Sequence, residues 1–169
     1  MNLPRLIVIQ GPTASGKTKL AIENAKTLKT VIISADSRQF YKEISIGTAK
    51  PSVEEMQGVK HYFIDSHSLE QEVSAAQFSK EAKELITEEL FYLENIVIVG
   101  GSGLFIQALC EGLDDIPHDP NLQERLTEEW KKEGFDYLMR ELEVKDPIYF
   151  NQIDKQNPLR VIRAIEAKR

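Results

Sequence analysis

The feature that most constrains the fold of this chain is a glycine-rich segment near its start, Gly11-Pro-Thr-Ala-Ser-Gly-Lys-Thr18. It matches the pattern G-x-x-x-x-G-K-[ST] in full and follows an apolar run, Leu6–Ile9, that predicts a buried parallel strand. A helix is expected from about Gly16. In such a loop the backbone N–H groups and the helix N-terminus attract anionic oxygens. The segment therefore predicts a diphosphate site made of Gly11, Pro12, Thr13, Ala14, Ser15, Gly16, Lys17 and Thr18.

Two residues of this loop have distinct expected roles. Lys17 supplies a full positive charge, and Thr18 offers a hydroxyl to a Mg²⁺ ion that bridges phosphate oxygens. By itself a loop of this kind favours a nucleotide kinase or NTPase, because nucleotide triphosphates are its usual ligands. Mg²⁺ is the cofactor that the loop predicts.

Strand and helix patterns alternate after the loop. Short runs rich in apolar residues predict further strands at Val31–Ile33, His61–Asp65 and Ile96–Val99. A helical pattern also opens at Ser74, where Gln77 gives capping-box spacing. The helix after the phosphate loop is expected to turn four residues inward: Leu20, Ala21, Ala25 and Leu28. We therefore predict an α/β fold, a P-loop NTPase-like parallel sheet flanked by helices, with its functional loops at the carboxyl ends of the strands.

The pattern changes near Gly112, beyond which only helical signals follow. Asp119 before Pro120, and Asn157 before Pro158, are typical of helix starts, with a capping side chain followed by proline at the first helical position. We expect two domains, a P-loop α/β core over residues 1–113 and an all-helical insert domain over residues 114–169.

Charge limits the choice of partner. The chain has 169 residues and a formal net charge of −6, which at face value argues against nucleic acid. The charge is uneven, however, because residues 111–146 hold twelve acids against five bases, whereas residues 151–169 hold five bases against two acids. The basic stretch fits either a solvated helix face or a surface for RNA.

Other features bear on the compartment. No apolar run approaches the roughly 18 residues that a membrane span needs, and the first residues lead into a strand without a signal peptide. The single cysteine, Cys110, excludes an internal disulfide and suits a reducing cytosol; its place in a helical stretch predicts a core position. We expect a cytoplasmic protein with no membrane contact.

A dense polar segment, SADSRQFY (34–41), follows the second predicted strand. Its Asp36 could serve as the magnesium ligand of an NTPase, as a helix cap, or in a site for a nucleic-acid base. Hydrogen-bonding groups beside the aromatic residues Phe40 and Tyr41 suit the recognition of a base edge, although one of the two rings is expected to pack inward.

A second glycine-rich turn, Gly100–Gly103, follows the strand at Ile96–Val99. Turns of this kind between a strand and a helix either bind anions or are simply tight turns. Ser102 could donate to a phosphate oxygen. Because the carboxyl ends of parallel strands meet at one edge, we expect this turn to lie beside the phosphate loop.

Six segments, taken in order, resemble the tRNA dimethylallyltransferase family. DSRQ followed by GTAKP is more specific than the phosphate loop, and the resemblance runs from about Leu6 to Glu166. Members of that family move a dimethylallyl group from its diphosphate to N6 of the adenine 3′ of the anticodon. The segments are GPTASGKT (11–18), SADSRQFY (34–41), GTAKP (47–51), VSAAQF (73–78), VGGSGLF (99–105) and NPLRVIRAIE (157–166).

The resemblance implies roles for individual residues. Asp36 matches the family's general base, with Lys17 and Thr13 also at the catalytic site, and Thr13 and Ser102 at positions that bind the diphosphate. At Gln123 many members carry an arginine that contacts tRNA. The tRNA contacts implied are Asp36, Ser37, Arg38, Gln39, Ser102, Gln123, Leu159, Arg160, Val161, Ile162 and Arg163.

Three hypotheses are open at this point. The first is dimethylallyl transfer to tRNA, with dimethylallyl diphosphate and the anticodon stem-loop as partners of a monomer. The second is a nucleotide kinase or NTPase that uses the same loop. The third is a non-catalytic, truncated module that binds RNA or phosphate, because members of the resembled family continue well past residue 169. The segment with which they return to the α/β core is expected to be absent.

Overall fold

The computed structural model describes residues 3–12, 14–45, 47–71, 73–113 and 119–168. The chain divides into two compact units, Met1–Leu113 and Asp114–Arg169, and each is described by itself. None of the helices in the described ranges is long and apolar enough to cross a membrane.

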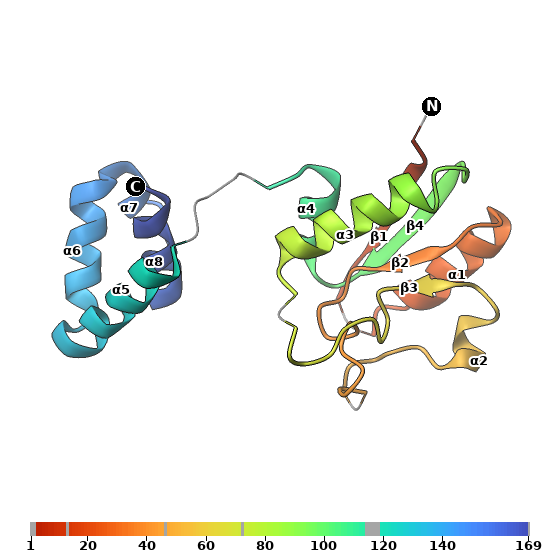
Figure 1. Ribbon diagram of the computed structural model, residues 1–169, viewed down its shortest axis with the longest axis horizontal. Coiled ribbons are helices and arrows are strands. Elements are labelled where there is room, and N and C mark those ends of the chain that lie inside the picture. Colours follow the sequence, from red (N-terminus) through yellow and green to blue (C-terminus); the bar gives the residue numbers. More distant parts are fainter. Residues whose placement is uncertain (1–2, 13, 46, 72, 114–118, 169) are drawn as a thin grey trace. The chain divides into compact units, whose positions relative to one another are not determined.

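One parallel sheet forms the centre of the first unit (Figure 1). Its strands are β1 (Arg5–Gln10), β2 (Ile32–Ser34), β3 (His61–Tyr62) and β4 (Asn95–Gly100), in the spatial order β1-β4-β2-β3. β1 pairs with β4 up to Gln10 and Gly100, and β2 pairs with β4 up to Ser34 and Val99. The loops that follow these three strands therefore leave from the same edge of the sheet, and the predicted α/β fold is confirmed.

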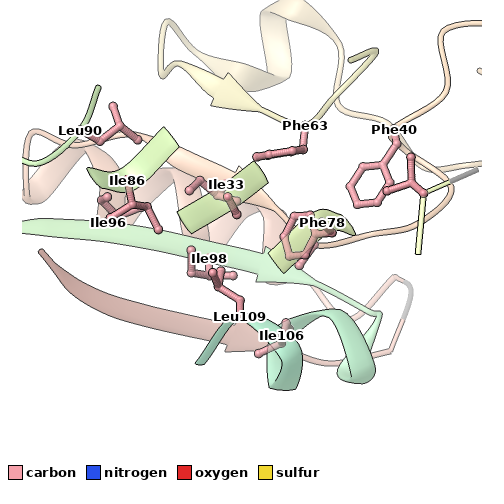
Figure 2. Packing of buried hydrophobic residues seen from close by; sticks show 13 residues of the cluster. Ile33, Phe40, Phe63, Phe78, Ile86, Leu90, Ile96, Ile98, Ile106 and Leu109 are labelled. Carbon is pink, nitrogen blue, oxygen red and sulfur yellow. The ribbon is translucent and has the colours of Figure 1, made fainter. Parts of the chain in front are cut away.

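The side chains of β4 alternate between two buried faces. Ile96 and Ile98 belong to a cluster that includes residues of α3 (Ala75–Glu88) and α4 (Gly103–Cys110), shown in Figure 2. Val97 and Val99 belong to a second cluster, with residues of α1 (Lys17–Thr27). Burial on both faces is what a central parallel strand requires, and it explains why this strand is a continuous apolar run.

β1 and α1 depart from the burial expected of them. No residue of β1 is buried, and Val8 is 41% exposed, so the prediction of a buried strand was wrong. The reason is that β1 pairs only with β4 and lies at the edge of the sheet among the described strands. Leu20 was also misplaced, since it is 49% exposed; the buried stripe of α1 consists of Ala21, Ile22 and Ala25.

Two smaller expectations need correction. The third strand ends at Tyr62 rather than Asp65, because Phe63 (φ 63°) and Asp65 (φ 51°) adopt the left-handed conformation, which a strand cannot accommodate. Cys110 is exposed at the last residue of α4 instead of lying in the core.

The second unit consists of helices in its described part: α5 (Pro120–Glu133), α6 (Phe135–Lys145), α7 (Pro147–Phe150) and α8 (Pro158–Ala167). The predicted caps are confirmed, since Asp119 Oδ1 accepts from the Leu122 N–H and Asn157 Oδ1 accepts from the Leu159 N–H, both at 3.1 Å. Trp130 packs against the edge of an aliphatic core formed by Leu122, Leu126, Leu138, Leu142, Ile153, Val161, Ile162, Ala164 and Ile165.

Gly100 shows how closely β2 and β4 approach at the functional edge. A Cβ atom on Gly100 would lie 2.1 Å from the carbonyl oxygen of Ala35, which is backbone and cannot move aside cheaply. We expect Gly100→Ala to lower the free energy of unfolding by about 3 kcal/mol, the upper part of the range for overpacking. Urea denaturation followed by circular dichroism measures the loss.

The neighbouring glycine provides the control for that variant. At Gly101 an added Cβ would make only ordinary contacts, the nearest at 3.6 Å, so Gly101→Ala should change stability by less than about 1 kcal/mol. Equal stability of the two variants would contradict the close approach of Gly100 to Ala35.

Candidate active site

A pocket of about 500 Å³ lies beside the phosphate loop, and we call it the larger pocket. The loop and the first turn of α1 form one wall, and residues that follow β2 form the other. It is lined by Ala14, Ser15, Gly16, Lys17, Thr18, Lys19, Ile22, Asp36, Gln39, Ala49, Pro51, Glu55 and Gln57.

The phosphate loop has the backbone that its glycines predict. Gly16 is the N-cap of α1 with φ 81°, a conformation that favours glycine, and Ala14 has φ 63°. The Lys17 ammonium group donates to the Pro12 carbonyl at 2.9 Å, which holds the charge over the loop. Thr13 lies outside the described residues. Lys17, Thr18 and the exposed N–H groups of the helix start can therefore serve one anion together.

A second pocket, of about 230 Å³, lies between the Asp36 turn and the glycine-rich turn after β4, and we call it the smaller pocket. Asp36 is the one residue that lines both pockets among the described residues. The smaller pocket is lined by Asp36, Ser37, Arg38, Gly47, Thr48, Gly101 and Ser102.

Asp36 stabilises a turn and does not cap a helix. Its Oδ1 accepts from the Arg38 N–H at 3.1 Å, and its carbonyl accepts from the Gln39 N–H at 2.9 Å. The second carboxylate oxygen lies beside Gly101, where a Cβ atom would be 3.8 Å from Oδ2. The helix-cap interpretation was wrong, because no described helix starts at this turn. The turn fixes the carboxylate while leaving Oδ2 able to accept a proton.

Ser102 joins the two turns that enclose the smaller pocket. Its Oγ accepts from the Ser37 N–H at 3.1 Å, and its own N–H donates to the Ala35 carbonyl at 3.2 Å. The Gly100–Gly103 turn lies beside the phosphate loop, as expected, since a Cβ atom on Gly101 would be 3.6 Å from the Gly11 carbonyl oxygen. However, Ser102 lines the smaller pocket and not the larger one, so a contact with a diphosphate held by the phosphate loop stays a prediction for it.

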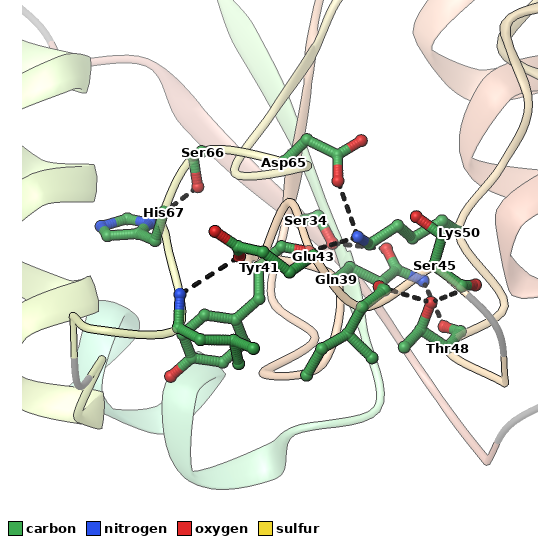
Figure 3. A network of polar contacts seen from close by, with 12 residues as sticks. Ser34, Gln39, Tyr41, Glu43, Ser45, Thr48, Lys50, Asp65, Ser66 and His67 are labelled. Carbon is green, nitrogen blue, oxygen red and sulfur yellow. Dashed lines mark hydrogen bonds and ion pairs between the residues drawn. The ribbon is translucent and has the colours of Figure 1, made fainter.

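Two residues of the polar segment lie inward. Phe40 is fully buried and stacks on Phe78 with 5.5 Å between ring centroids, which rules out stacking of this ring on RNA. Gln39 is 9% exposed, and both ends of its amide are hydrogen-bonded within the chain (Figure 3). A direct tRNA contact by Gln39 therefore conflicts with its burial. Ser37 and Arg38 line the smaller pocket and can contact a substrate.

The basic stretch of the second unit divides between surface and core. Leu159 is exposed, and Arg160 and Arg163 line a pocket of about 500 Å³ beside α7. Val161 and Ile162 are fully buried in the helical core, so side-chain contacts of these two with tRNA are excluded in this conformation. The physical reason is helical periodicity: successive residues of α8 are rotated by about 100°, so Val161 and Ile162 share the buried face while Arg160 lies outside it.

The remaining predicted RNA contacts, Arg160, Arg163 and Gln123, differ in how their charged neighbours would affect RNA binding. Arg163 is tied to the buried carboxylate of Glu166, whereas the ion pair of Arg160 with Asp154 is long, at 3.8 Å. Gln123 lies on α5 in a shallow hollow shared with Glu124, Glu128 and Lys131. Acidic neighbours make this face a poor surface for a phosphate backbone.

Two pocket residues were missed because a short helix was missed. Glu55 and Gln57 line the larger pocket from α2 (Val53–Met56) and its C-terminal end. A capping box starts this helix: Ser52 Oγ accepts from the Glu55 N–H at 3.2 Å, and Glu55 Oε2 accepts from the Ser52 N–H at 2.7 Å. The Ser-x-x-Glu spacing was present in the sequence as a signal.

The larger pocket suits a magnesium ion that is coordinated mainly by the phosphate oxygens of a bound substrate. Mg²⁺ prefers oxygen donors and is usually bound through one or two protein groups plus phosphates. Thr18 offers a hydroxyl and Asp36 a carboxylate. Within the described residues, no group of three or more His, Cys, Asp or Glu side chains could hold a metal by itself.

The parallel sheet, the phosphate loop between β1 and α1, and the pocket at the carboxyl edge define a protein of the P-loop NTPase-like class. Comparison with known proteins identifies the family within this class. The model of the IPP transferase family matches residues 39–169. A tRNA dimethylallyltransferase from Cytophaga hutchinsonii is 49% identical over 97% of this chain and 54% of its own length. The chain therefore belongs to the IPP transferase family, as its motifs predicted.

Solved structures agree in fold. A full-length tRNA isopentenylpyrophosphate transferase from Bacillus halodurans is 38% identical with a TM-score of 0.61, covering 96% of this chain and 54% of that one. A eukaryotic dimethylallyltransferase acting on tRNA shares the fold with a TM-score of 0.73 at 24% identity, over 96% of this chain and 41% of that one. The chain spans about half the length of the curated relatives that it matches.

Proposed function

We propose that the full-length protein transfers a dimethylallyl group from dimethylallyl diphosphate to N6 of the adenine 3′ of the anticodon in tRNA. The observation that carries the proposal is the position of Asp36, which lines both the larger and the smaller pocket. A carboxylate at the junction of two pockets suits a reaction between two substrates. The names of the relatives support the choice of prenyl diphosphate and tRNA as those substrates.

The proposed reaction exchanges one bond for another. The N6 lone pair attacks the first carbon of the dimethylallyl group, the bond from that carbon to the diphosphate oxygen breaks, and pyrophosphate leaves with the electron pair. The proton lost by N6 passes to the carboxylate of Asp36. A neutral exocyclic amine is a poor nucleophile, so a base within hydrogen-bond reach accelerates the attack.

The larger pocket supplies what the leaving group needs. Negative charge builds on the diphosphate as the carbon–oxygen bond breaks, and Lys17 with the N–H groups at the start of α1 can neutralise it. Mg²⁺, held by Thr18 and the diphosphate, would add further positive charge at the same oxygens. We propose the diphosphate here and the adenine in the smaller pocket, between Arg38 and Ser102.

The test assays the full-length protein with dimethylallyl diphosphate and an anticodon stem-loop, and separately with ATP in the absence of RNA. Transfer of labelled dimethylallyl to an anticodon stem-loop with adenine in place supports the proposal, and a stem-loop with guanine at that position should be inert. Saturable ATP hydrolysis or phosphoryl transfer without RNA would favour a nucleotide kinase instead. Binding of the stem-loop without any turnover would favour a non-catalytic module.

Arg160 provides a test of the RNA surface. Its ion pair with Asp154 is long and exposed, so replacing it should not disturb the helical core. We expect Arg160→Gln to weaken stem-loop binding and to reduce the slope of log K against log salt by about 1, as loss of one phosphate contact does. Fluorescence anisotropy at several salt concentrations measures both.

The control is Arg125→Gln. Arg125 lies on α5 in the same unit and is also exposed and paired, with Glu129 at 3.6 Å. It should leave the salt slope unchanged. If Arg160→Gln and Arg125→Gln had equal effects, the loss would reflect net charge rather than a contact made by Arg160.

A further inference from the structure

The loop Gly47–Pro51 forms part of the wall of both pockets in the first unit. Gly47 and Thr48 line the smaller pocket, whereas Ala49 and Pro51 line the larger one. The backbone therefore crosses from one pocket to the other between Thr48 and Ala49. Because Asp36 also lines both pockets, the position of this loop sets the space around the carboxylate.

A buried glutamine holds the loop at that crossing (Figure 3). The Nε2 of Gln39 donates to the carbonyl of Ala49 at 3.0 Å and to that of Thr48 at 3.4 Å, while its Oε1 accepts from Ser34 Oγ at 2.9 Å. Its backbone N–H donates to the Asp36 carbonyl at 2.9 Å. One residue thus joins the end of β2, the Asp36 turn and the loop. Ser34, Gln39 and Thr48 are buried, so losing one of the bonds among them leaves its partner unsatisfied.

A buried lysine fixes the same loop from its next residue. The Lys50 ammonium group donates to the Tyr41 carbonyl and forms an ion pair with Asp65 at 2.6 Å, and its side chain is 8% exposed. Burying an ammonium group is costly unless it is paired and hydrogen-bonded, as it is here. Lys50 therefore ties the loop to the segment that follows the Asp36 turn, and to the segment after β3.

We propose that Gln39 is a positioning residue for the transfer reaction, and that Lys50 assists it. Gln39 acts through the loop it holds, keeping the walls of both pockets in register with the Asp36 carboxylate. The inference rests on the function proposed above. It replaces the tRNA contact that the sequence predicts for Gln39, because the polar groups of this side chain already have partners within the chain.

The test variant is Gln39→Glu in the full-length protein. Ionised glutamate keeps the acceptor for Ser34 but presents a carboxylate to the carbonyls of Thr48 and Ala49, which repel it. We expect kcat to fall by about 10- to 100-fold, while the Kd for the stem-loop stays within about two-fold of the parent value. Gln71→Glu is the control, since the side chain of the exposed Gln71 accepts from the Ser68 N–H, a bond that glutamate preserves; it should leave kcat unchanged.

Acidification gives a second readout for the same variant. A protonated carboxylic acid has the donor and acceptor pattern of an amide, and facing carbonyl oxygens favour the protonated form. The ratio of kcat for Gln39→Glu to kcat for the parent should therefore rise as the pH is lowered. A flat ratio, or a Kd for the stem-loop that rises more than kcat falls, would overturn the positioning role.

A measurement that does not depend on turnover separates this inference from the proposed function. Gln39→Met should increase hydrogen exchange over residues 47–51, and Lys50→Met should do the same, with unchanged exchange in β4. Transfer by the parent protein tests the proposed function alone. If the parent is active but both variants keep parental kcat and parental exchange, only the positioning role fails. If Gln39→Met does not fold, Lys50→Met carries the test.

Discussion

Replacing Asp36 by asparagine is expected to lower kcat for prenyl transfer by about 10²- to 10⁴-fold, the usual contribution of a general base. Asparagine keeps an oxygen acceptor for the Arg38 N–H, which lies 3.1 Å from Asp36 Oδ1, so the turn should survive the change. It removes the carboxylate that we propose as the acceptor of the N6 proton. Single-turnover transfer of labelled dimethylallyl to a saturating stem-loop measures the effect.

Binding measurements decide between the two roles open to Asp36. A base leaves the affinity for dimethylallyl diphosphate unchanged, whereas a magnesium ligand does not, so the Kd should be compared with and without Mg²⁺. Asp136→Asn, on the exposed first turn of α6, removes the same charge and should be fully active. Parental turnover by Asp36→Asn would exclude the base, and a lost Mg²⁺-dependent affinity would assign the carboxylate to the metal.

Lys17→Met should have the next largest effect, a loss of about 10²- to 10³-fold in kcat/KM for dimethylallyl diphosphate. The ammonium group is held over the phosphate loop by its 2.9 Å bond to the Pro12 carbonyl, where it can turn to a phosphate oxygen. Methionine is unbranched like lysine and only one atom shorter, and it removes the charge. Steady-state kinetics with the diphosphate varied at saturating stem-loop measure the loss.

The Lys17→Met substitution should affect kcat/KM for the diphosphate without affecting the affinity for RNA. Affinity for the stem-loop should stay within about two-fold, because the role that we propose for Lys17 is to neutralise the leaving group and not to contact the RNA. Lys80→Met, on the exposed face of α3, removes one positive charge elsewhere and should be neutral. A fall in stem-loop affinity as large as the fall in kcat/KM would instead indicate that Lys17 contacts the RNA.

Local sequence patterns predicted most of the strands and helix starts of the fold. The apolar runs at Val31–Ile33 and Ile96–Val99 are strands because central parallel strands bury both faces, and that leaves a continuous apolar signature. Asp119 and Asn157 were found because helix caps obey short-range rules. The capping box at Ser74 is only half made: its Oγ accepts from the Gln77 N–H, while Gln77 donates to Glu81 instead.

Features that depend on distant parts of the chain were not predictable. An edge strand and a central strand can share the same apolar run, so the local pattern does not indicate that Val8 is exposed. Likewise a glutamine in a polar segment looks like a contact residue. Gln39 is buried because Thr48 and Ala49, nine and ten residues further on, present their carbonyls to it. Sequence motifs were enough to locate the candidate site. The contacts that support it join residues from different loops and could be identified only in the structure.

Trp130 has a practical consequence for work on this protein. It is the single tryptophan of the chain, and it packs against the core of the helical unit. Its fluorescence therefore reports on that unit alone, whereas circular dichroism follows helices in both units. Where the two signals change at different denaturant concentrations, each unit unfolds independently; where they coincide, the units unfold cooperatively.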